Sequence, residues 1–111
     1  MDKNKFISLD IGTTTIRCLV IDTNLKILGS AFAKVQLLYP EEGRVEIDPE
    51  WLWNTVISVV NNALYDAKIT AANVTSLGIC TQRSTFITWK KDTNEYFHNF
   101  ITWKDVRVVH L

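Results

Sequence analysis

Residues 10–15, with the sequence DIGTTT, place an acid, a glycine and three hydroxyls side by side near the N-terminus. They lie between two apolar, strand-like runs, Phe6 to Leu9 and Ile16 to Ile21, so we expect a tight turn there. Glycine lets the backbone approach a ligand closely, and successive turn amides and hydroxyls can donate to phosphate oxygens. A carboxylate can hold Mg²⁺ directly or through its waters. The stretch therefore suits a metal-bound polyphosphate.

An ordinary β-hairpin is the alternative for this stretch, because glycine- and threonine-rich turns are common between strands and Asp-x-Gly alone is a weak motif. Two other phosphate-binding patterns, G-x-x-x-x-G-K-[ST] and G-x-G-x-x-G, are absent from the sequence. The chain has four glycines, which are too scattered to form either pattern: Gly12, Gly29, Gly43 and Gly78. The rest of the chain has to decide between the two interpretations.

Composition favours a single domain with a real core and excludes several function classes. The chain has 111 residues, of which 47% are hydrophobic, and its formal net charge is zero. Lysine and arginine do not cluster, so no nucleic-acid-binding face is expected. The longest apolar runs are too short to span a bilayer. The N-terminus has no long apolar stretch of the signal-peptide type, so we expect a cytoplasmic protein.

Neither the cysteines nor the histidines indicate a metal site. Cys18 and Cys80 both lie in apolar, strand-like runs, so we expect buried free thiols in a reducing compartment. A disulfide between them would require their strands to be neighbours with favourable geometry. His98 and His110 are isolated from other metal-ligating residues, and we interpret both as surface or loop residues.

Three strands and a helix are expected in the first two thirds of the chain. Strands over residues 6–9, 16–22 and 27–35 are joined by very short connections, which favours an antiparallel meander. After a loop over residues 37–47, Asp48 is a good N-cap, Pro49 fits the first helical position, and Glu50 suits the positive end of the helix dipole. The sequence therefore predicts a helix that begins at Pro49.

The predicted helix carries an apolar stripe and a polar face, so one side of it should pack on a sheet. We expect Trp51 and Trp53 to be core or staple residues, with an aromatic platform for a ligand as the less favoured alternative. The apolar stripe comprises Trp53, Val56, Ile57, Val60, Ala63, Leu64 and Ala67. The polar face comprises Asn54, Ser58, Asn61, Asn62 and Asp66.

A short buried strand over residues 75–81 is expected to follow the helix. Residues 86–89 are a further strand candidate, followed by a turn at 91–94 and a return through 96–102. The predicted fold class is α/β, with an antiparallel three-strand meander, a crossover helix and a parallel strand.

Four segments in the same order make the chain resemble the N-terminal part of the FGGY carbohydrate kinases, and among these the glycerol kinases. The resemblance covers almost the whole chain, so residues 1–111 are interpreted as an incomplete portion of that family's N-terminal domain. It implies part of an actin- and Hsp70-like (ribonuclease H-like) ATPase fold. The four segments are residues 10–17, 39–49, 78–85 and 101–107.

The resemblance implies that ATP and Mg²⁺ are cofactors and that the γ-phosphoryl group is transferred to a hydroxyl of a polyol or sugar. The threonines would hold the phosphates, the glycine would allow their close approach, the acid would orient the hydrated metal, and the arginine would stabilise transferred charge. The residues to which the resemblance assigns these roles are Asp10, Gly12, Thr13, Thr14, Thr15 and Arg17. No catalytic residue is assigned in this chain.

The resemblance also implies a substrate site made of Arg83, Ser84 and Trp103. Arg83 would bond substrate hydroxyls, and Trp103 would form an apolar wall, with a core tryptophan as the equal alternative. Glycerol kinases usually have glutamate at the position of Ser84, so another polyol or a sugar is a candidate substrate. We read Asp105 as a helix cap and Arg107 as the partner of a carboxylate, both structural.

The chain ends soon after its fourth matching segment, and the family's catalytic base and second phosphate loop have no counterpart in it. We therefore expect no kinase activity from residues 1–111 alone. A truncated, non-enzymatic binding or regulatory product is the alternative, and an exposed sheet edge would let it self-associate. An actin-like chaperone is disfavoured by residues 82–83 and 103–105, which suit a polyol site.

Overall fold

The computed structural model describes residues 4–110, which fall into two compact units. The sheet unit comprises residues 4–35 and 54–82, and the hairpin unit comprises residues 36–53 and 83–110. We describe each unit by itself. In the part of the chain that the structure describes, no helix is both long and apolar enough to cross a membrane.

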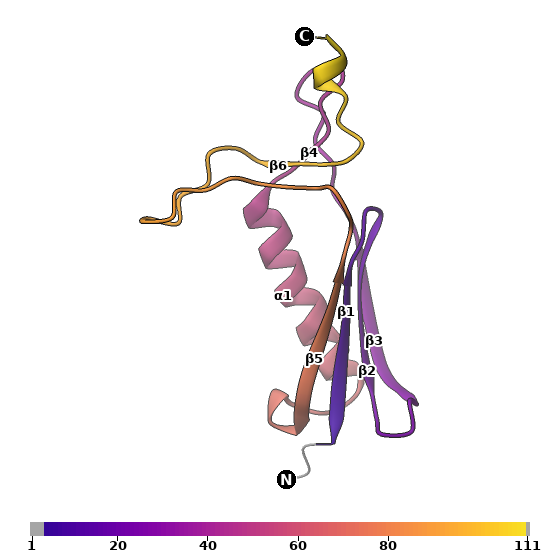
Figure 1. Ribbon diagram of the computed structural model, residues 1–111. Helices are drawn as coiled ribbons and strands as arrows, with labels where there is room; N and C mark the ends of the chain where they lie inside the picture. The colour runs from indigo at the N-terminus through magenta and orange to yellow at the C-terminus, as the bar shows by residue number, and fades with distance from the viewer. Residues whose placement is uncertain (1–3, 111) are drawn as a thin grey trace. The chain divides into compact units, whose positions relative to one another are not determined.

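A four-stranded mixed sheet forms the sheet unit (Figure 1). Strands β1 (Lys5–Ile11), β2 (Thr15–Ile21) and β3 (Ile27–Lys34) form an antiparallel meander, and β5 (Val74–Thr81) pairs in parallel with β1. The strand order is β3-β2-β1-β5, and helix α1 (Pro49–Asp66) lies in the crossover between β3 and β5. The predicted α/β class with meander, crossover helix and parallel strand is confirmed.

The core lies between one face of this sheet and one side of α1. Alternate residues of β1 and β2 point to that face, because successive side chains of a strand point to opposite sides. The buried residues of the two strands and of α1 are Ile7, Leu9, Ile16, Cys18, Val20, Val56, Val59 and Ala63.

Helix α1 begins where the sequence predicts. The Asp48 carboxylate accepts a hydrogen bond from the Glu50 amide at 3.0 Å, as an N-cap does. The predicted stripe is partly wrong, because Trp53 and Ile57 are 64% and 42% exposed. The side of α1 that faces the sheet carries Val56, Val59 and Ala63. Ile57 lies about 100° around the helix from Val56 and therefore points away from this side.

Strand β5 differs from the buried strand that was expected. Leu77 and Ile79 are 43% and 58% exposed, and Cys80 is exposed as well. β5 is an edge strand, so only β1 covers it laterally. The expectation of a buried Cys80 thiol was therefore wrong, whereas Cys18 is buried and both thiols are free. Strand β1 separates their strands, so the condition for a disulfide is not met.

The hairpin unit contains little regular structure. Strands β4 (Glu46–Ile47) and β6 (Phe100–Ile101) form a two-residue antiparallel pair. The strand candidate over residues 86–89 forms only isolated bridges, Phe86 with Ile101 and Trp89 with Tyr96. The chain then ends in a short 3₁₀ helix, η2 (Arg107–His110).

The sequence predicts that both histidines are surface or loop residues, and the structure describes the side chain of His98 only. His98 is half-buried, with its Nδ1 2.6 Å from the Asn99 carbonyl and its Nε2 2.7 Å from the Thr88 hydroxyl oxygen. The Asn99 contact requires a proton on Nδ1, so both ring nitrogens serve the local structure. The expectation for the His110 side chain lies outside the described residues.

Gly29 of β3 should not tolerate a side chain. A Cβ atom there would lie 2.5 Å from the Ala67 amide nitrogen and 2.7 Å from the Ala63 carbonyl oxygen, both backbone atoms. We expect Gly29→Ala to lower the free energy of unfolding by about 1–3 kcal/mol, the usual cost of overpacking. Gly78→Ala is the matched control, because a Cβ there meets nothing within 4 Å. Urea denaturation of both variants tests this, and equal stability of the two would contradict it.

Candidate functional site

The turn at the end of β1 is shorter than the sequence suggested. Asp10 and Ile11 still belong to β1 and lie opposite Arg17 and Ile16, while Thr15 begins β2. Only residues 12–14 form the turn, which the Gly12 amide closes by donating to the Thr15 carbonyl at 3.0 Å. The Gly12 turn, as we call residues 12–14, is therefore flanked by side chains that regular strands hold in place.

Hydrogen bonds from the residues that directly follow β3 and β5 fix this turn. The Val35 amide donates to the Thr14 carbonyl at 2.8 Å, and the Gln82 amide donates to the Ile11 carbonyl at 2.9 Å. The Gln82 side-chain Nε2 donates to the Gly12 carbonyl at 3.0 Å. Three carbonyl oxygens that would repel an anion are thus already bound by protein donors.

Gly12 leaves a space that no other residue would leave. A Cβ atom at this position would lie 2.9 Å from the Thr15 carbonyl oxygen, closer than real side chains come to backbone atoms. The turn therefore needs glycine for room. Thr14 is exposed, and Thr13 and Thr15 are half-buried, so the threonines that follow Gly12 remain partly accessible.

Asp10 and Arg17 are both exposed and lie on the sheet face that points away from α1. The Arg17 guanidinium lies over the Phe32 ring, 5.4 Å from its centroid. Residues 4–110 contain no group of three or more His, Cys, Asp or Glu side chains that could surround a metal ion. A carboxylate such as that of Asp10 fits a hydrated Mg²⁺, which keeps several waters and needs only one or two protein carboxylates.

The predicted substrate residues all lie in the hairpin unit. Arg83 and Ser84 are exposed, and Ser84 has a φ of 62°. A left-handed backbone is uncommon for serine and often marks a functional site. The Thr85 hydroxyl accepts a hydrogen bond from the Trp103 amide at 3.3 Å, so the structure places Trp103 beside this segment.

Trp103 is not a core residue. Its side chain is 53% exposed, and the Lys104 ammonium lies 5.7 Å from the ring centroid. The core alternative for this tryptophan is therefore wrong. Trp103 belongs to the hairpin unit and the turn at residues 12–14 belongs to the sheet unit, and each predicted site is described within its own unit.

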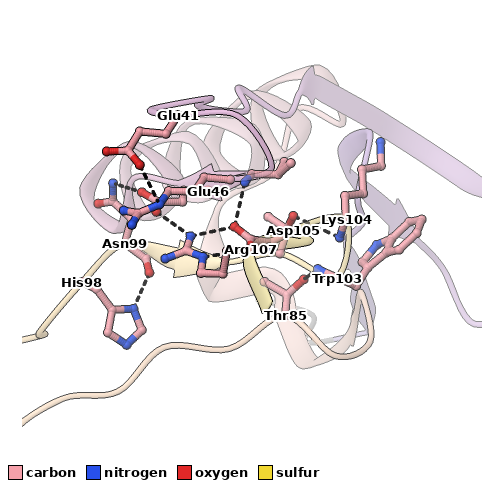
Figure 2. Close-up of polar contacts among 12 residues, drawn as sticks. Glu41, Glu46, Thr85, His98, Asn99, Trp103, Lys104, Asp105 and Arg107 are labelled. Atoms are coloured by element: carbon pink, nitrogen blue, oxygen red, sulfur yellow. Dashed lines mark hydrogen bonds and ion pairs between the residues drawn. The ribbon is translucent and has the colours of Figure 1, made fainter. Parts of the chain in front are cut away.

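A charged cluster holds the segment that carries Trp103. Figure 2 shows Arg107 between two carboxylates. Its Nη2 lies 2.6 Å from an Asp105 oxygen and 2.7 Å from a Glu46 oxygen. Asp105 also accepts from the Val45 amide at 2.8 Å, and Glu46 accepts from the Asn99 side chain at 3.2 Å. These bonds connect residues 45–46 to residues 99–107.

The expected pairing of Arg107 with a carboxylate is confirmed. Asp105 lies one residue before the N-cap position of η2, where its Oδ1 accepts from the Arg107 amide at 3.0 Å. Hydrogen bonds from the Arg107 side chain hold the pKa of Asp105 well below its usual range, against the opposing effect of burial. The same bonds to Asp105 and Glu46 raise the pKa of Arg107.

Sequence reasoning missed the roles of Gln82 and Glu46. Gln82 directly follows β5, and a parallel register of β5 with β1 places it beside the turn after Ile11. Glu46 is buried between Val45 and Ile47. A single acid inside a short apolar run could have indicated a paired carboxylate, because unpaired buried charges are costly.

Comparison with known proteins gives one family. A sequence model described as the FGGY family of carbohydrate kinases, N-terminal domain, matches residues 5–111. Glycerol kinase 5 of Danio rerio is 50% identical over 95% of this chain and 20% of its own length, and that of Homo sapiens is 48% identical over the same shares. Glycerol kinase of Allorhizobium ampelinum is 39% identical over 91% of this chain and 20% of its own length.

Solved structures agree. A Plasmodium falciparum glycerol kinase with ADP has a TM-score of 0.82 and 26% identity, over 98% of this chain and 22% of that one. Lactobacillus acidophilus gluconate kinase has a TM-score of 0.77 and 26% identity, over 91% and 20% of the two chains. The expected actin- and Hsp70-like ATPase fold and the resemblance to glycerol kinases are confirmed. The chain spans about a fifth of the length of these relatives.

Removal of Arg107 should destabilise the chain, because two carboxylates would lose their shared partner. We expect Arg107→Met to lower the free energy of unfolding by roughly 1–3 kcal/mol. Arg44→Met is the control, since Arg44 makes only an exposed ion pair with Glu41 at 3.5 Å.

The same variant should change the acid sensitivity of the chain. The lowered folded-state pKa of Asp105 means that this group stabilises the fold above about pH 4 and loses that effect as the pH falls. Stability should therefore fall less steeply between about pH 5 and pH 2 in Arg107→Met than in the wild type. The free energy of unfolding of both proteins is measured by urea denaturation at each pH. If the two plots of this free energy against pH are parallel, Arg107 does not lower the pKa of Asp105.

Proposed function

The chain belongs to the FGGY family of carbohydrate kinases, and on that premise we propose that it supplies the first phosphate-binding turn and part of the substrate site of an ATP-dependent kinase. The enzyme transfers the γ-phosphoryl group of ATP to a hydroxyl of a small polyol or sugar. Residues 1–111 are then an incomplete portion of the family's N-terminal domain.

The geometry around Gly12 is the observation that supports this proposal most. The turn excludes a Cβ atom at that position, and its Gly12 and Thr14 carbonyls are bound by other protein groups. The three residues after Gly12 carry hydroxyls, and turns of this composition suit anions. The donor set thus fits a polyphosphate, and the carboxylate of Asp10 fits a hydrated Mg²⁺.

Each side chain then has a role in binding and charge stabilisation. Thr13, Thr14 and Thr15 hold phosphate oxygens, Asp10 holds the metal through its waters, and Arg17 stabilises negative charge on the phosphates. Asp10 would hold Mg²⁺ through its waters, and the ion would supply neutralisation of negative charge during phosphoryl transfer. Such transfer depends on positioning and charge stabilisation, which is what these residues provide.

The substrate segment suits a molecule with several hydroxyls and a carbon backbone. The Arg83 guanidinium donates to hydroxyl oxygens, the exposed Trp103 indole packs against carbon atoms, and Ser84 offers one short hydroxyl. A carboxylate at the position of Ser84 could accept hydrogen bonds from two substrate hydroxyls. The serine side chain is shorter and offers a single hydroxyl group. We therefore place the substrate among polyols and sugars and do not restrict it to glycerol.

Self-association is a further part of the proposal. In the described part of the chain the outer edge of β5 pairs with no strand, and Leu77 and Ile79 are exposed beside it. Exposed sheet edges are templates for pairing with another chain. We place the protein in the cytoplasm, where its two free thiols would stay reduced.

Binding of Mg-ATP to the purified chain tests the proposal. Isothermal titration calorimetry should show binding by the wild type that Gly12→Ala weakens roughly tenfold or more, because the added Cβ strains the turn. Gly78→Ala should bind like the wild type. A coupled ADP-release assay with glycerol, pentitols and sugars should show no turnover by residues 1–111 alone.

The other outcomes of this experiment are equally informative. Absence of Mg-ATP binding would reject the phosphate-binding turn. If the chain then also self-associates in light scattering, the non-enzymatic alternative, a binding or regulatory product, would be favoured. Polyol-dependent ADP release by residues 1–111 would overturn the proposed inactivity of the chain alone.

A further inference from the structure

A row of side chains crosses the sheet on the face that points away from α1. Register pairs Phe32 with Arg17 and Arg17 with Asp10, from β3 through β2 to β1. The three positions share a face, because their neighbours Ile16 and Cys18 are buried on the opposite side. Arg17 therefore has a carboxylate on one side and an aromatic ring on the other.

Opposite charges at directly facing positions of antiparallel strands usually attract each other, since their Cβ atoms lie only about 4.5–5.5 Å apart. Among residues 4–110, however, no ion pair joins Arg17 to Asp10. The Arg17 guanidinium instead lies over the Phe32 ring at 5.4 Å. An exposed cation–π contact and an exposed ion pair are of similar strength, so one aromatic ring is enough to decide between the two arrangements.

We propose that Phe32 is a positioning residue that draws Arg17 away from Asp10. It thereby keeps the carboxylate and the guanidinium of the proposed phosphate site from forming an ion pair. The inference rests on the proposed function. The Asp10 carboxylate remains available to a hydrated Mg²⁺, and the Arg17 guanidinium remains available to phosphate oxygens. Without the ring, the two side chains neutralise each other and both roles are weakened.

The ring contributes only through Arg17. Phe32 is 62% exposed, so it has no large role in the core. Replacement by leucine keeps an apolar residue on the strand and removes the π face, whereas Phe32→Tyr keeps the face. The two variants therefore separate positioning from general apolar packing.

Nuclear magnetic resonance of the arginine side chains shows directly whether the Arg17 guanidinium lies over the Phe32 ring or pairs with Asp10. The Arg17 Nε–H signal is assigned by its disappearance in Arg17→Lys. In the wild type and Phe32→Tyr we expect it to shift upfield because of the ring. In Phe32→Leu we expect that shift to be lost and the signal to respond to Asp10→Asn, because an ion pair has formed.

Calorimetry with Mg²⁺ and inorganic tripolyphosphate measures the consequence for binding. Phe32→Leu should weaken the affinity about two- to fivefold, a range set by one exposed charge interaction, and Phe32→Tyr should retain it. In an Asp10→Asn background, Phe32→Leu should have no further effect, since no ion pair can form.

Two results would overturn the inference: an Arg17 signal that is the same in the wild type and Phe32→Leu, or equal affinities of these two proteins for Mg²⁺–tripolyphosphate. If the wild type binds no Mg²⁺–tripolyphosphate, the proposed function fails instead. In that case the Arg17 signal still decides whether Phe32 separates the two charged side chains.

Discussion

Parallel pairing of β5 with β1 is the constraint on which the Gly12 turn depends. The register places Thr81 beside Ile11, so the next residue, Gln82, lies where the chain of β1 turns at Gly12. Its backbone and side chain then both bind carbonyls of this corner, while Val35 at the end of β3 binds a third. A loop that would otherwise be free is thereby fixed by three strands.

A second constraint operates in the hairpin unit and is electrostatic. This unit has only a two-residue strand pair, so regular backbone pairing cannot hold it. The guanidinium of Arg107 instead joins Asp105 and Glu46, which in turn bind the Val45 amide and the Asn99 side chain. Because Trp103 lies within the segment so held, a structural ion cluster determines where an exposed indole is presented.

Much of the fold could be predicted from the sequence because its local signals are strong. Short connections indicated the meander, and Asp48-Pro49-Glu50 indicated the start of α1. Burial was predicted less well, because it depends on what covers an element. Leu77, Ile79 and Cys80 form an apolar strand, yet they are exposed at a sheet edge.

In the candidate site, too, the local sequence predicted some features, whereas contacts between residues far apart in the sequence could not be predicted. The importance of Gly12 was apparent from the turn composition, although the structure gives the reason as a clash with the Thr15 carbonyl. Arg17 was identified as a candidate from the motif, but its contact with Phe32 depends on cross-strand register. Gln82 and Glu46 act on residues 70 and 61 positions away, at Gly12 and Arg107, which no local pattern reports.

The central claim is that residues 12–15 bind the phosphates of a metal-bound nucleotide. Amide chemical-shift mapping of the ¹⁵N-labelled chain, titrated with Mg-ATP, tests it most directly because each backbone N–H reports separately. The account predicts that the largest shifts fall on Gly12, Thr13, Thr14 and Thr15. Saturable shifts confined to other residues, with these four unchanged, would contradict it.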